Sequence, residues 1–213
     1  MPVKSRIQII VDGIPLRVEA GVPLLATLKA QDVAIPTLCY HPQWEQQERC
    51  SLCIVEVLTA QGIWKAAHAC SLYCEPNLVI RVSSDCIHSL RAWAARLLLA
   101  RGPFRDSAVA RTLHDILDAA SADPDYQEPP LIWSENRAMP AGCILCGRCI
   151  TICRKIGKNK LTFLGKGQRL TISYINDHAD KAACGKCHAC SLVCPTAYIQ
   201  SNGQAAFSAK LYR

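Results

Sequence analysis

The sequence predicts an α+β protein in three parts, and each part has its own signature. Residues 1–83 contain short apolar runs separated by turn signals, which is typical of a small β-sheet domain. Residues 84–142 contain two stretches in which apolar side chains recur at helical spacing. Residues 143–213 contain eight of the chain's 14 cysteines, in two runs of identical spacing. We therefore expect a sheet domain, a helical spacer with a linker, and a cysteine-rich domain.

The first part opens with a predicted hairpin and a helix. Two apolar runs within residues 6–20 flank Asp12-Gly13, a dipeptide that favours a two-residue hairpin turn. Pro23 then opens an apolar segment over residues 23–31, and proline is favoured in the first turn of a helix. The chain is therefore expected to begin with two strands and one short helix.

A loop with cysteines, a second hairpin and a further strand follow. Residues 53–60 and 63–69 are apolar runs on either side of Gln61-Gly62, and residues 77–82 form another short apolar run. Hairpin, helix, cysteine loop and hairpin is the element order of a β-grasp ferredoxin, whose cysteines bind a [2Fe–2S] cluster. We therefore expect residues 1–83 to form a β-grasp [2Fe–2S] ferredoxin domain.

Three ligands of this cluster are predicted directly, namely Cys39, Cys50 and Cys53. A [2Fe–2S] cluster of this type requires four cysteine thiolates. Cys70 follows the second hairpin and can face back towards the loop, whereas Cys74 comes four residues later and is the alternative. We expect Cys70 to be the fourth ligand and Cys74 to be a neighbouring thiol.

Each of the two C-terminal runs reads C-x-x-C-x-x-C-x-x-x-C, and the second is followed by Pro195. This is the ligand spacing of bacterial two-cluster ferredoxins, in which the fourth cysteine of each run binds the other cluster. We therefore expect a two-[4Fe–4S] ferredoxin domain over residues 143–213. One cluster is predicted on Cys143, Cys146, Cys149 and Cys194, and the other on Cys184, Cys187, Cys190 and Cys153.

Two other uses of the cysteines fit the sequence less well. Structural zinc sites are built from two C-x-x-C pairs, which leaves the third interval and the Cys-Pro ending unexplained. A disulfide framework needs an oxidising compartment, but residues 1–13 lack an apolar core followed by a cleavage site. The longest apolar stretch, around residues 92–100, is interrupted by Arg96 and is too short to span a bilayer. We therefore expect a cytoplasmic iron–sulfur protein.

The spacer is predicted to contain two helices. Ser84 or Asp85 can cap the first, which ends at Gly102-Pro103, and we expect Cys86 near its start to be a small buried residue. The second helix covers residues 106–121, and an irregular linker follows up to residue 142. The first apolar stripe consists of Ile87, Leu90, Trp93, Ala94 and Leu97, and the second of Val109, Leu113, Ile116 and Leu117. We expect the first stripe to pack on the chain's own domains.

The formal net charge of +7 does not indicate a nucleic-acid-binding protein. A cluster held by four thiolates carries about two negative charges when oxidised, so three clusters bring the net charge to about +1. The basic residues after the first C-terminal run can offset this charge, namely Arg154, Lys155, Lys158, Lys160 and Lys166. No aromatic residues interleave with the basic ones. The sequence also lacks a dinucleotide fingerprint, a P-loop and a nucleophile elbow, so we expect no catalytic site of its own.

Several segments resemble a known family. LCYHP, CSLCIVEV and HACS, around the first cysteine group, are similar to the N-terminal part of the large iron–sulfur subunit of respiratory complex I. CILCGRCITICRKIG and CGKCHACSLVCPTA are similar to the segment that follows in that family. In a chain of 213 residues with no molybdopterin-type domain, the closest resemblance is to the small diaphorase subunit of soluble NAD-reducing [NiFe]-hydrogenases.

The resemblance implies an electron-transfer subunit of a hydrogen:NAD oxidoreductase complex. In that family the subunit bridges an FMN- and NAD-binding diaphorase subunit to the hydrogenase small and large subunits, so that H2 oxidation is coupled to NAD reduction. The expected partners are therefore these subunits, with no nucleic acid. The equivalent subunit of an NAD-dependent formate dehydrogenase is the first alternative, and a zinc-stabilised interaction module is the second.

The chain departs from the family pattern in two places. Glycine usually lies two residues before the second [2Fe–2S] cysteine, where it permits a positive φ, but this chain has Glu48, so we expect a rearranged loop. Many relatives bind a further [4Fe–4S] cluster through a His-x-x-x-Cys-x-x-Cys stretch. No cysteine occurs here from Ile87 through Gly142. We therefore expect three clusters rather than four.

Overall fold

The computed structural model describes residues 5–44, 48–121, 142–167, 170–175 and 184–207. The chain divides into two compact units, one made of residues 1–97 and 112–127 and the other of residues 98–111 and 128–213. The residues predicted as a helical spacer are thus shared between the two units. Nearly all of the predicted linker lies outside the described residues.

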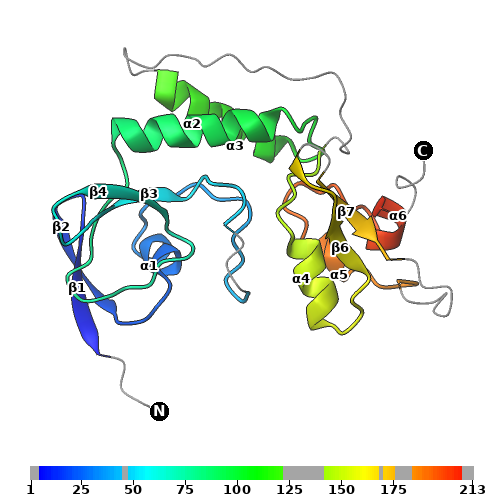
Figure 1. The fold of residues 1–213 in the computed structure, drawn as a ribbon, viewed down its shortest axis with the longest axis horizontal. Coiled ribbons are helices and arrows are strands. Elements are labelled where there is room, and N and C mark those ends of the chain that lie inside the picture. The colour runs from blue at the N-terminus through cyan, green and yellow to red at the C-terminus, as the bar shows by residue number, and fades with distance from the viewer. Residues whose placement is uncertain (1–4, 45–47, 122–141, 168–169, 176–183, 208–213) are drawn as a thin grey trace. The chain divides into compact units, whose positions relative to one another are not determined.

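A five-stranded mixed sheet forms the framework of the first unit (Figure 1). Its order is β2-β1-β5-β3-β4, with β1 and β5 parallel and the other neighbours antiparallel. Asp12 (φ 48°) and Gly13 (φ 81°) form the first turn, as the predicted hairpin requires. The elements are β1 (Arg6–Val11), β2 (Ile14–Glu19), α1 (Leu24–Ala30), β3 (Ile54–Leu58), β4 (Trp64–His68) and β5 (Val79–Arg81). Both predicted hairpins, the helix and the last strand are confirmed.

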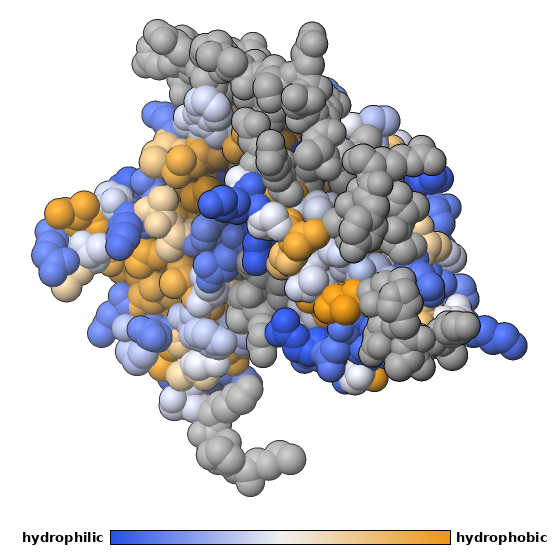
Figure 2. Space-filling model, turned by 45° about the vertical axis from the view of Figure 1, so that its right-hand side comes forward, coloured by the Kyte–Doolittle hydropathy of each residue, from blue (hydrophilic) through white to orange (hydrophobic). Residues whose placement is uncertain are grey.

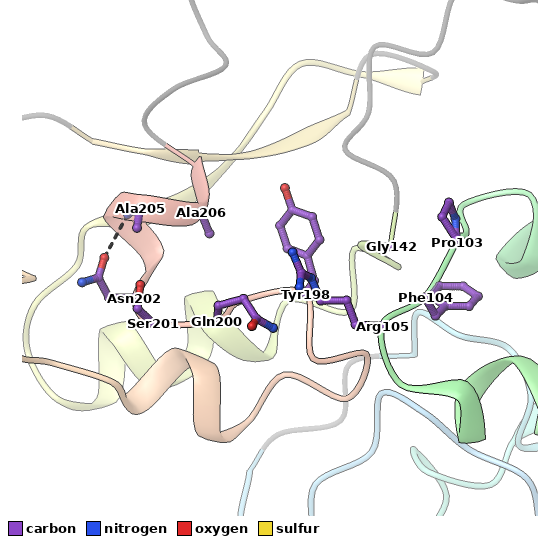
Figure 3. Close-up of a pocket in the computed structure, with 10 residues that line it drawn as sticks. All are labelled: Pro103, Phe104, Arg105, Gly142, Tyr198, Gln200, Ser201, Asn202, Ala205 and Ala206. Atoms are coloured by element: carbon purple, nitrogen blue, oxygen red, sulfur yellow. Dashed lines mark hydrogen bonds between the residues drawn. The ribbon is translucent and has the colours of Figure 1, made fainter.

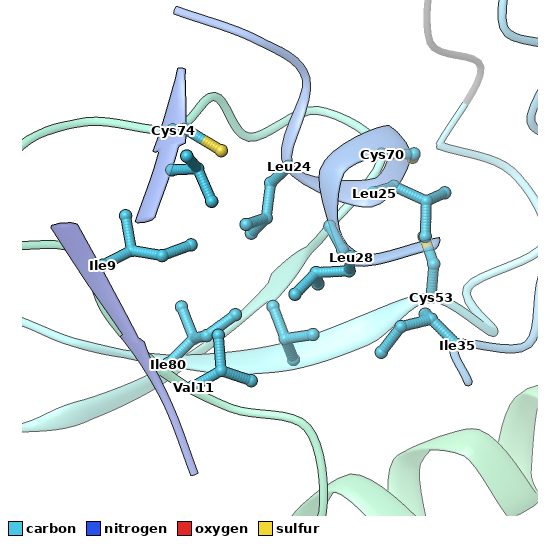
Figure 4. Packing of buried hydrophobic residues seen from close by; sticks show 13 residues of the cluster. Ile9, Val11, Leu24, Leu25, Leu28, Ile35, Cys53, Cys70, Cys74 and Ile80 are labelled. Atoms are coloured by element: carbon cyan, nitrogen blue, oxygen red, sulfur yellow. The ribbon is translucent and has the colours of Figure 1, made fainter. Parts of the chain in front are cut away.

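Helix α1 buries its apolar face against this sheet. Leu24, Leu25 and Leu28 are fully buried and pack in one cluster with Ile9 and Ile80 of the sheet (Figure 4). Burying each such side chain contributes about 1.5–3 kcal/mol. The same cluster includes two of the predicted ligands, Cys53 and Cys70, so the hydrophobic core also holds cysteine side chains in place.

Helices α2 (Asp85–Leu99) and α3 (Ser107–Ser121) lie where two helices were predicted. Ser84 caps α2, because its Oγ accepts a hydrogen bond from the Ile87 amide at 3.2 Å. The same hydroxyl donates to the carboxylate of Glu56 at 2.8 Å, which ties the start of the helix to β3.

The predicted apolar stripe of α2 is only partly right. Ile87 is fully buried and Ala94 is 8% exposed, but Trp93 and Leu97 are 38% and 47% exposed. The buried face instead continues through Ala92, Ala95 and Leu98. Small alanines let neighbouring backbone approach this helix closely, so side-chain size alone did not identify the inner face.

The second unit combines short helices with a two-stranded sheet. Its hairpin turns at Gly165 (φ 82°) and Gly167 (φ 56°). Buried apolar residues such as Leu161 and Ile172 form one cluster with five of its cysteines. The elements are α4 (Arg148–Lys155), β6 (Leu161–Leu164), β7 (Thr171–Tyr174), α5 (Ala189–Leu192) and α6 (Gly203–Phe207).

The surface mixes hydrophobic and hydrophilic side chains, as Figure 2 shows for one face. Leu192, within the second C-terminal cysteine run, is 84% exposed. None of the helices in the described ranges combines the length and apolarity needed to cross a bilayer.

Candidate iron–sulfur sites

Four thiols of the first unit gather beside the start of β3. Cys50 and Cys53 belong to the loop before this strand, Cys39 to the segment after α1, and Cys70 follows β4. All four are buried, with at most 2% exposure. The Cys39 thiol hydrogen-bonds to Cys50 and the Cys70 thiol to Cys53, and Cys39 and Cys70 also interact electrostatically. The structure thus brings the predicted set together.

These four thiols cannot all ionise by themselves. Because Cys39 donates a hydrogen bond to the Cys50 sulfur, the pKa of Cys50 falls to about 5 whereas the pKa of Cys39 rises. The Cys70 thiol likewise donates to Cys53, so the pKa of Cys53 falls and that of Cys70 rises. In each pair, the hydrogen bond thus favours ionisation of one thiol and disfavours ionisation of the other. A cation is needed to ionise all four, and a coordinating metal deprotonates its thiol ligands outright.

Cys74 stands apart from this group. Its thiol hydrogen-bonds to Thr27 Oγ1 at 3.4 Å, and burial raises its pKa. Figure 4 shows Cys74 on one side of the hydrophobic cluster and Cys53 with Cys70 on the other. Of the two candidates for the fourth position, Cys70 therefore lies with the other three thiols, whereas Cys74 does not.

Backbone amides point at the sulfurs of the first group. The Leu38 amide nitrogen lies 3.5 Å from Cys50 Sγ. The amides of Arg49 and Glu48 donate to Cys39 and Cys70 respectively. Such hydrogen bonds to sulfur are one of the features that fix the reduction potential of an iron–sulfur cluster. The site therefore supplies hydrogen-bond donors to its sulfurs, as iron–sulfur sites commonly do.

The loop adopts left-handed backbone conformations without glycine. Glu48 has φ 47° and Ser51 has φ 52°, and such a conformation costs an L-residue about 1–2 kcal/mol. The Ser51 hydroxyl lies 3.3 Å from Nε2 of His68 on β4, which ties the loop to the sheet. At Glu48 the backbone thus keeps the positive φ that glycine would allow, and its amide still reaches Cys70.

The cysteines of the second unit form two neighbouring groups. In the first, burial raises the pKa of Cys149, and the thiols of Cys146, Cys143 and Cys194 raise it further. Burial also raises the pKa of Cys146 to about 12, with contributions from Cys143 and Cys194. The set predicted from the crossed ligand pattern, with Cys194 from the second run, is therefore gathered here.

The second group contains Cys184, Cys187 and Cys190. Burial raises the pKa of Cys190 to about 11, and the other two thiols raise it further. Cys153 lies in one buried cluster with Cys143, Cys149, Cys184 and Cys190, and its sulfur accepts a hydrogen bond from the Lys160 amide at 3.2 Å. Cys149 and Cys153 lie on successive turns of α4, so this helix brings two of the thiols into that cluster.

Local backbone geometry again directs amides to sulfur. Leu145 has φ 54° and its amide donates to Cys143, while the Arg148 amide donates to Cys146. Gly147, between Cys146 and Cys149, is the N-cap of α4 and has φ 79°, a conformation that glycine adopts without strain.

A zinc site and an iron–sulfur cluster differ in the volume that their ligands enclose. Zinc ligands lie about 2.0–2.3 Å from a single ion, whereas a [4Fe–4S] cluster has one thiolate on each of four irons. Among the described residues, no three His, Cys, Asp or Glu side chains are placed closely enough to hold a single ion.

Two arginines beside these groups were not identified from the sequence. The Arg91 guanidinium donates from Nη2 to the carbonyl of Ile54, next to Cys53, at 2.7 Å. Arg101 donates from Nε to the carbonyl of Cys143 at 2.6 Å. The bonded residues are 37 and 42 positions apart in sequence, so no local motif connects them.

The expectation for Cys86 is wrong. Its side chain is exposed in the first turn of α2, where the neighbouring Ile87 takes the buried position.

A cavity of about 610 Å³ adjoins the first cysteine group of the second unit (Figure 3). Phe104 and Arg105 line one side, and Tyr198 and Gln200 lie opposite. Burial raises the pKa of Tyr198 to about 12, and Cys143 contributes to this rise. The cavity therefore borders the group that contains Cys143, although none of its lining residues is a cysteine.

Comparison with known proteins agrees with the geometry of the first unit. Residues 4–85 match the family described as a 2Fe-2S iron-sulfur cluster binding domain. The chain carries a [2Fe–2S] cluster-binding domain. The matched residues include the loop with Cys39, Cys50 and Cys53 and the position of Cys70.

Most of the chain is related to parts of larger redox proteins. It is 26% identical over 92% of its length to a subunit of the NADH-quinone oxidoreductase of Rhizobium meliloti. It is 24% identical over 85% to the mitochondrial NADH-ubiquinone oxidoreductase 78 kDa subunit of Neurospora crassa, and 24% over 86% to a Staphylococcus haemolyticus protein named "Putative formate dehydrogenase". The chain spans only 24%, 26% and 20% of the lengths of these relatives. The resemblance to the complex I subunit is thereby confirmed.

One solved structure extends the similarity to both units. A chain in the crystal structure of an NAD+-reducing [NiFe]-hydrogenase in the H2-reduced state superposes with a TM-score of 0.59 at 21% identity. The match covers 81% of this chain and 76% of that chain. The two chains therefore share a fold, in agreement with the family that the sequence resembles.

Replacing Glu48 with glycine should stabilise the loop relative to replacing it with alanine. Alanine meets the same left-handed penalty as glutamate, whereas glycine does not, so E48G should be about 1 kcal/mol more stable than E48A. Urea unfolding of both variants measures this difference. If E48G were no more stable than E48A, the left-handed conformation of Glu48 would be contradicted.

Proposed function

We propose that the chain is an electron-transfer subunit that binds one [2Fe–2S] and two [4Fe–4S] clusters. The observation that carries this proposal is the gathering of the cysteines, most of them buried, into one set in the first unit and another in the second unit, which supports the ligand spacing of the sequence. The ligand sets are Cys39, Cys50, Cys53 and Cys70; Cys143, Cys146, Cys149 and Cys194; and Cys184, Cys187, Cys190 and Cys153. When bound, such clusters accept and release single electrons.

The chain's own residues would serve these clusters in two ways. Burial of the thiols keeps water away, and backbone amides donate to the sulfurs, which favours the reduced state. Residues 1–83 would form the [2Fe–2S] domain, residues 84–142 the helical spacer with its linker, and residues 143–213 the two-[4Fe–4S] domain. The proposed role is a relay without a catalytic site of its own.

The partners that this relay would connect are an FMN- and NAD-binding diaphorase subunit and a [NiFe]-hydrogenase module. The fold shared with a chain of an NAD+-reducing [NiFe]-hydrogenase supports this choice, since the match covers 76% of that chain. The complex would oxidise H2 and reduce NAD in the cytoplasm. A formate dehydrogenase is the second candidate partner, because 24% identity to a relative with that name extends over 86% of the chain.

Metal analysis tests the cluster content. The anaerobically purified chain should contain about ten irons and no stoichiometric zinc, since one [2Fe–2S] and two [4Fe–4S] clusters hold two, four and four irons. After reduction with dithionite, EPR at low temperature should show a [2Fe–2S] signal and two interacting [4Fe–4S] signals. Stoichiometric zinc without iron would refute the proposal, and about fourteen irons would refute the cluster count.

Serine variants of Cys70 and Cys74 test the fourth [2Fe–2S] ligand. Cys70→Ser should abolish or strongly alter the [2Fe–2S] EPR signal and leave the [4Fe–4S] signals, because it removes a ligand from the first unit. Cys74→Ser is the matched control and should keep all signals, since its thiol bonds to Thr27 instead. The opposite pattern, with the signal lost only in Cys74→Ser, would make Cys74 the ligand.

A further inference from the structure

Arg91 of α2 holds a positive charge next to the first cysteine group. Its Nη2 donates to the carbonyl of Ile54 at 2.7 Å, and Ile54 directly follows Cys53. The guanidinium interacts electrostatically with Cys53 and, to a smaller extent, with Asp12. Its Nε is buried and has no hydrogen-bond partner in the described part of the chain. A half-buried guanidinium whose Nε is shielded from water fits a neighbouring group with net negative charge.

Arg101 holds a corresponding charge in the second unit. Its Nε donates to the carbonyl of Cys143 at 2.6 Å. The guanidinium also hydrogen-bonds to the Cys143 side chain, and the two groups attract each other electrostatically. Arg101 is thus in direct contact with one proposed ligand of a [4Fe–4S] cluster. An arginine remains protonated throughout the pH range in which proteins fold, so this charge is permanent.

A fixed cation near a cluster favours the added electron. Reduction makes the cluster more negative by one charge, so a nearby guanidinium stabilises the reduced form more than the oxidised form and raises the potential. Burial strengthens this effect, because salt and water screen a buried pair much less than an exposed one. Among the basic residues that follow the first C-terminal run, Arg154 and Lys155 are exposed and are therefore screened more strongly, whereas Lys160 is buried.

Both arginines come from the segment that has no cluster ligands. Arg91 lies in the middle of α2, and Arg101 follows two residues after its end. No cysteine occurs from Ile87 through Gly142. The segment nevertheless contacts both units. Arg91 donates to Ile54, the residue after Cys53, in the first unit, and Arg101 donates to Cys143 in the second.

We propose that Arg91 and Arg101 set the reduction potentials of two clusters, Arg91 that of the [2Fe–2S] cluster and Arg101 that of the [4Fe–4S] cluster bound by Cys143. This inference rests on the proposed clusters and assigns a new role to the helical segment. Each arginine acts on the cluster of its own unit, so the two effects are separable.

Redox titrations followed by EPR test this role. Arg91→Gln keeps a hydrogen-bond donor for Ile54 but removes the charge, and it should lower the equilibrium constant for reduction of the [2Fe–2S] cluster about tenfold. A tenfold change is about 59 mV for a one-electron couple. Arg101→Gln should shift one [4Fe–4S] potential in the same direction and leave the [2Fe–2S] potential unchanged.

Matched variants separate charge from structure. Arg91→Lys and Arg101→Lys keep the charge and should retain potentials close to that of the original protein. Arg111→Gln removes an exposed charge from α3 and should shift neither potential. Equal potentials in the Gln variants and the original protein would overturn the proposal. So would shifts in the Lys variants as large as those in the Gln variants.

Loss of a cluster in a variant is also informative. If a Gln variant loses only its own cluster and the Lys variant restores it at the original potential, the positive charge is required and the proposal is supported. If neither variant retains the cluster, the arginine serves folding and the proposal is overturned for that site. An original protein without iron would instead refute the proposed function itself, which is a distinguishable result.

Discussion

Burying a thiolate away from water is unfavourable unless a positive charge accompanies it. In the first unit, Cys39 and Cys50 share a proton across a hydrogen bond, and Cys53 and Cys70 do the same. The surrounding β-sheet and helix α1 hold these groups at the edge of a hydrophobic core, where hydration cannot relieve the charge. A metal cluster that supplies cationic iron resolves this constraint, because it ionises all four thiols at once.

The same constraint explains the unusual backbone around the cysteines. Glu48, Ser51 and Leu145 all adopt positive φ, which is unfavourable for side chains other than glycine. The amides of Glu48 and Leu145 donate to the sulfurs of Cys70 and Cys143, so part of the strain is offset by these hydrogen bonds. Local strain is commonly retained at functional sites when the surrounding fold determines the conformation, and here the fold and the thiols do so together.

The sequence was most informative where spacing is itself a geometric constraint. The turn predicted at Asp12-Gly13 corresponds to short-range geometry that the structure reproduces. The crossed ligand pattern stays a prediction, although the structure brings Cys194 near Cys149. The sequence was less informative where tertiary packing determines which side chains are buried. Trp93 lies on the outer side of α2 because small alanines line the inner side, and Cys86 is exposed because Ile87 occupies the adjacent inward position. Arg91 reaches Ile54 only through the fold, and no local pattern marks such a contact.

The number of electrons that one chain accepts tests the proposed role as an electron carrier most directly. Anaerobic titration with a calibrated one-electron reductant, followed by the visible absorbance of the clusters, counts the electrons that one chain accepts. A relay with three one-electron centres should accept about three electrons per chain and return them to an oxidant without loss of iron. A chain that accepts none would not be an electron carrier, whatever metal it contains.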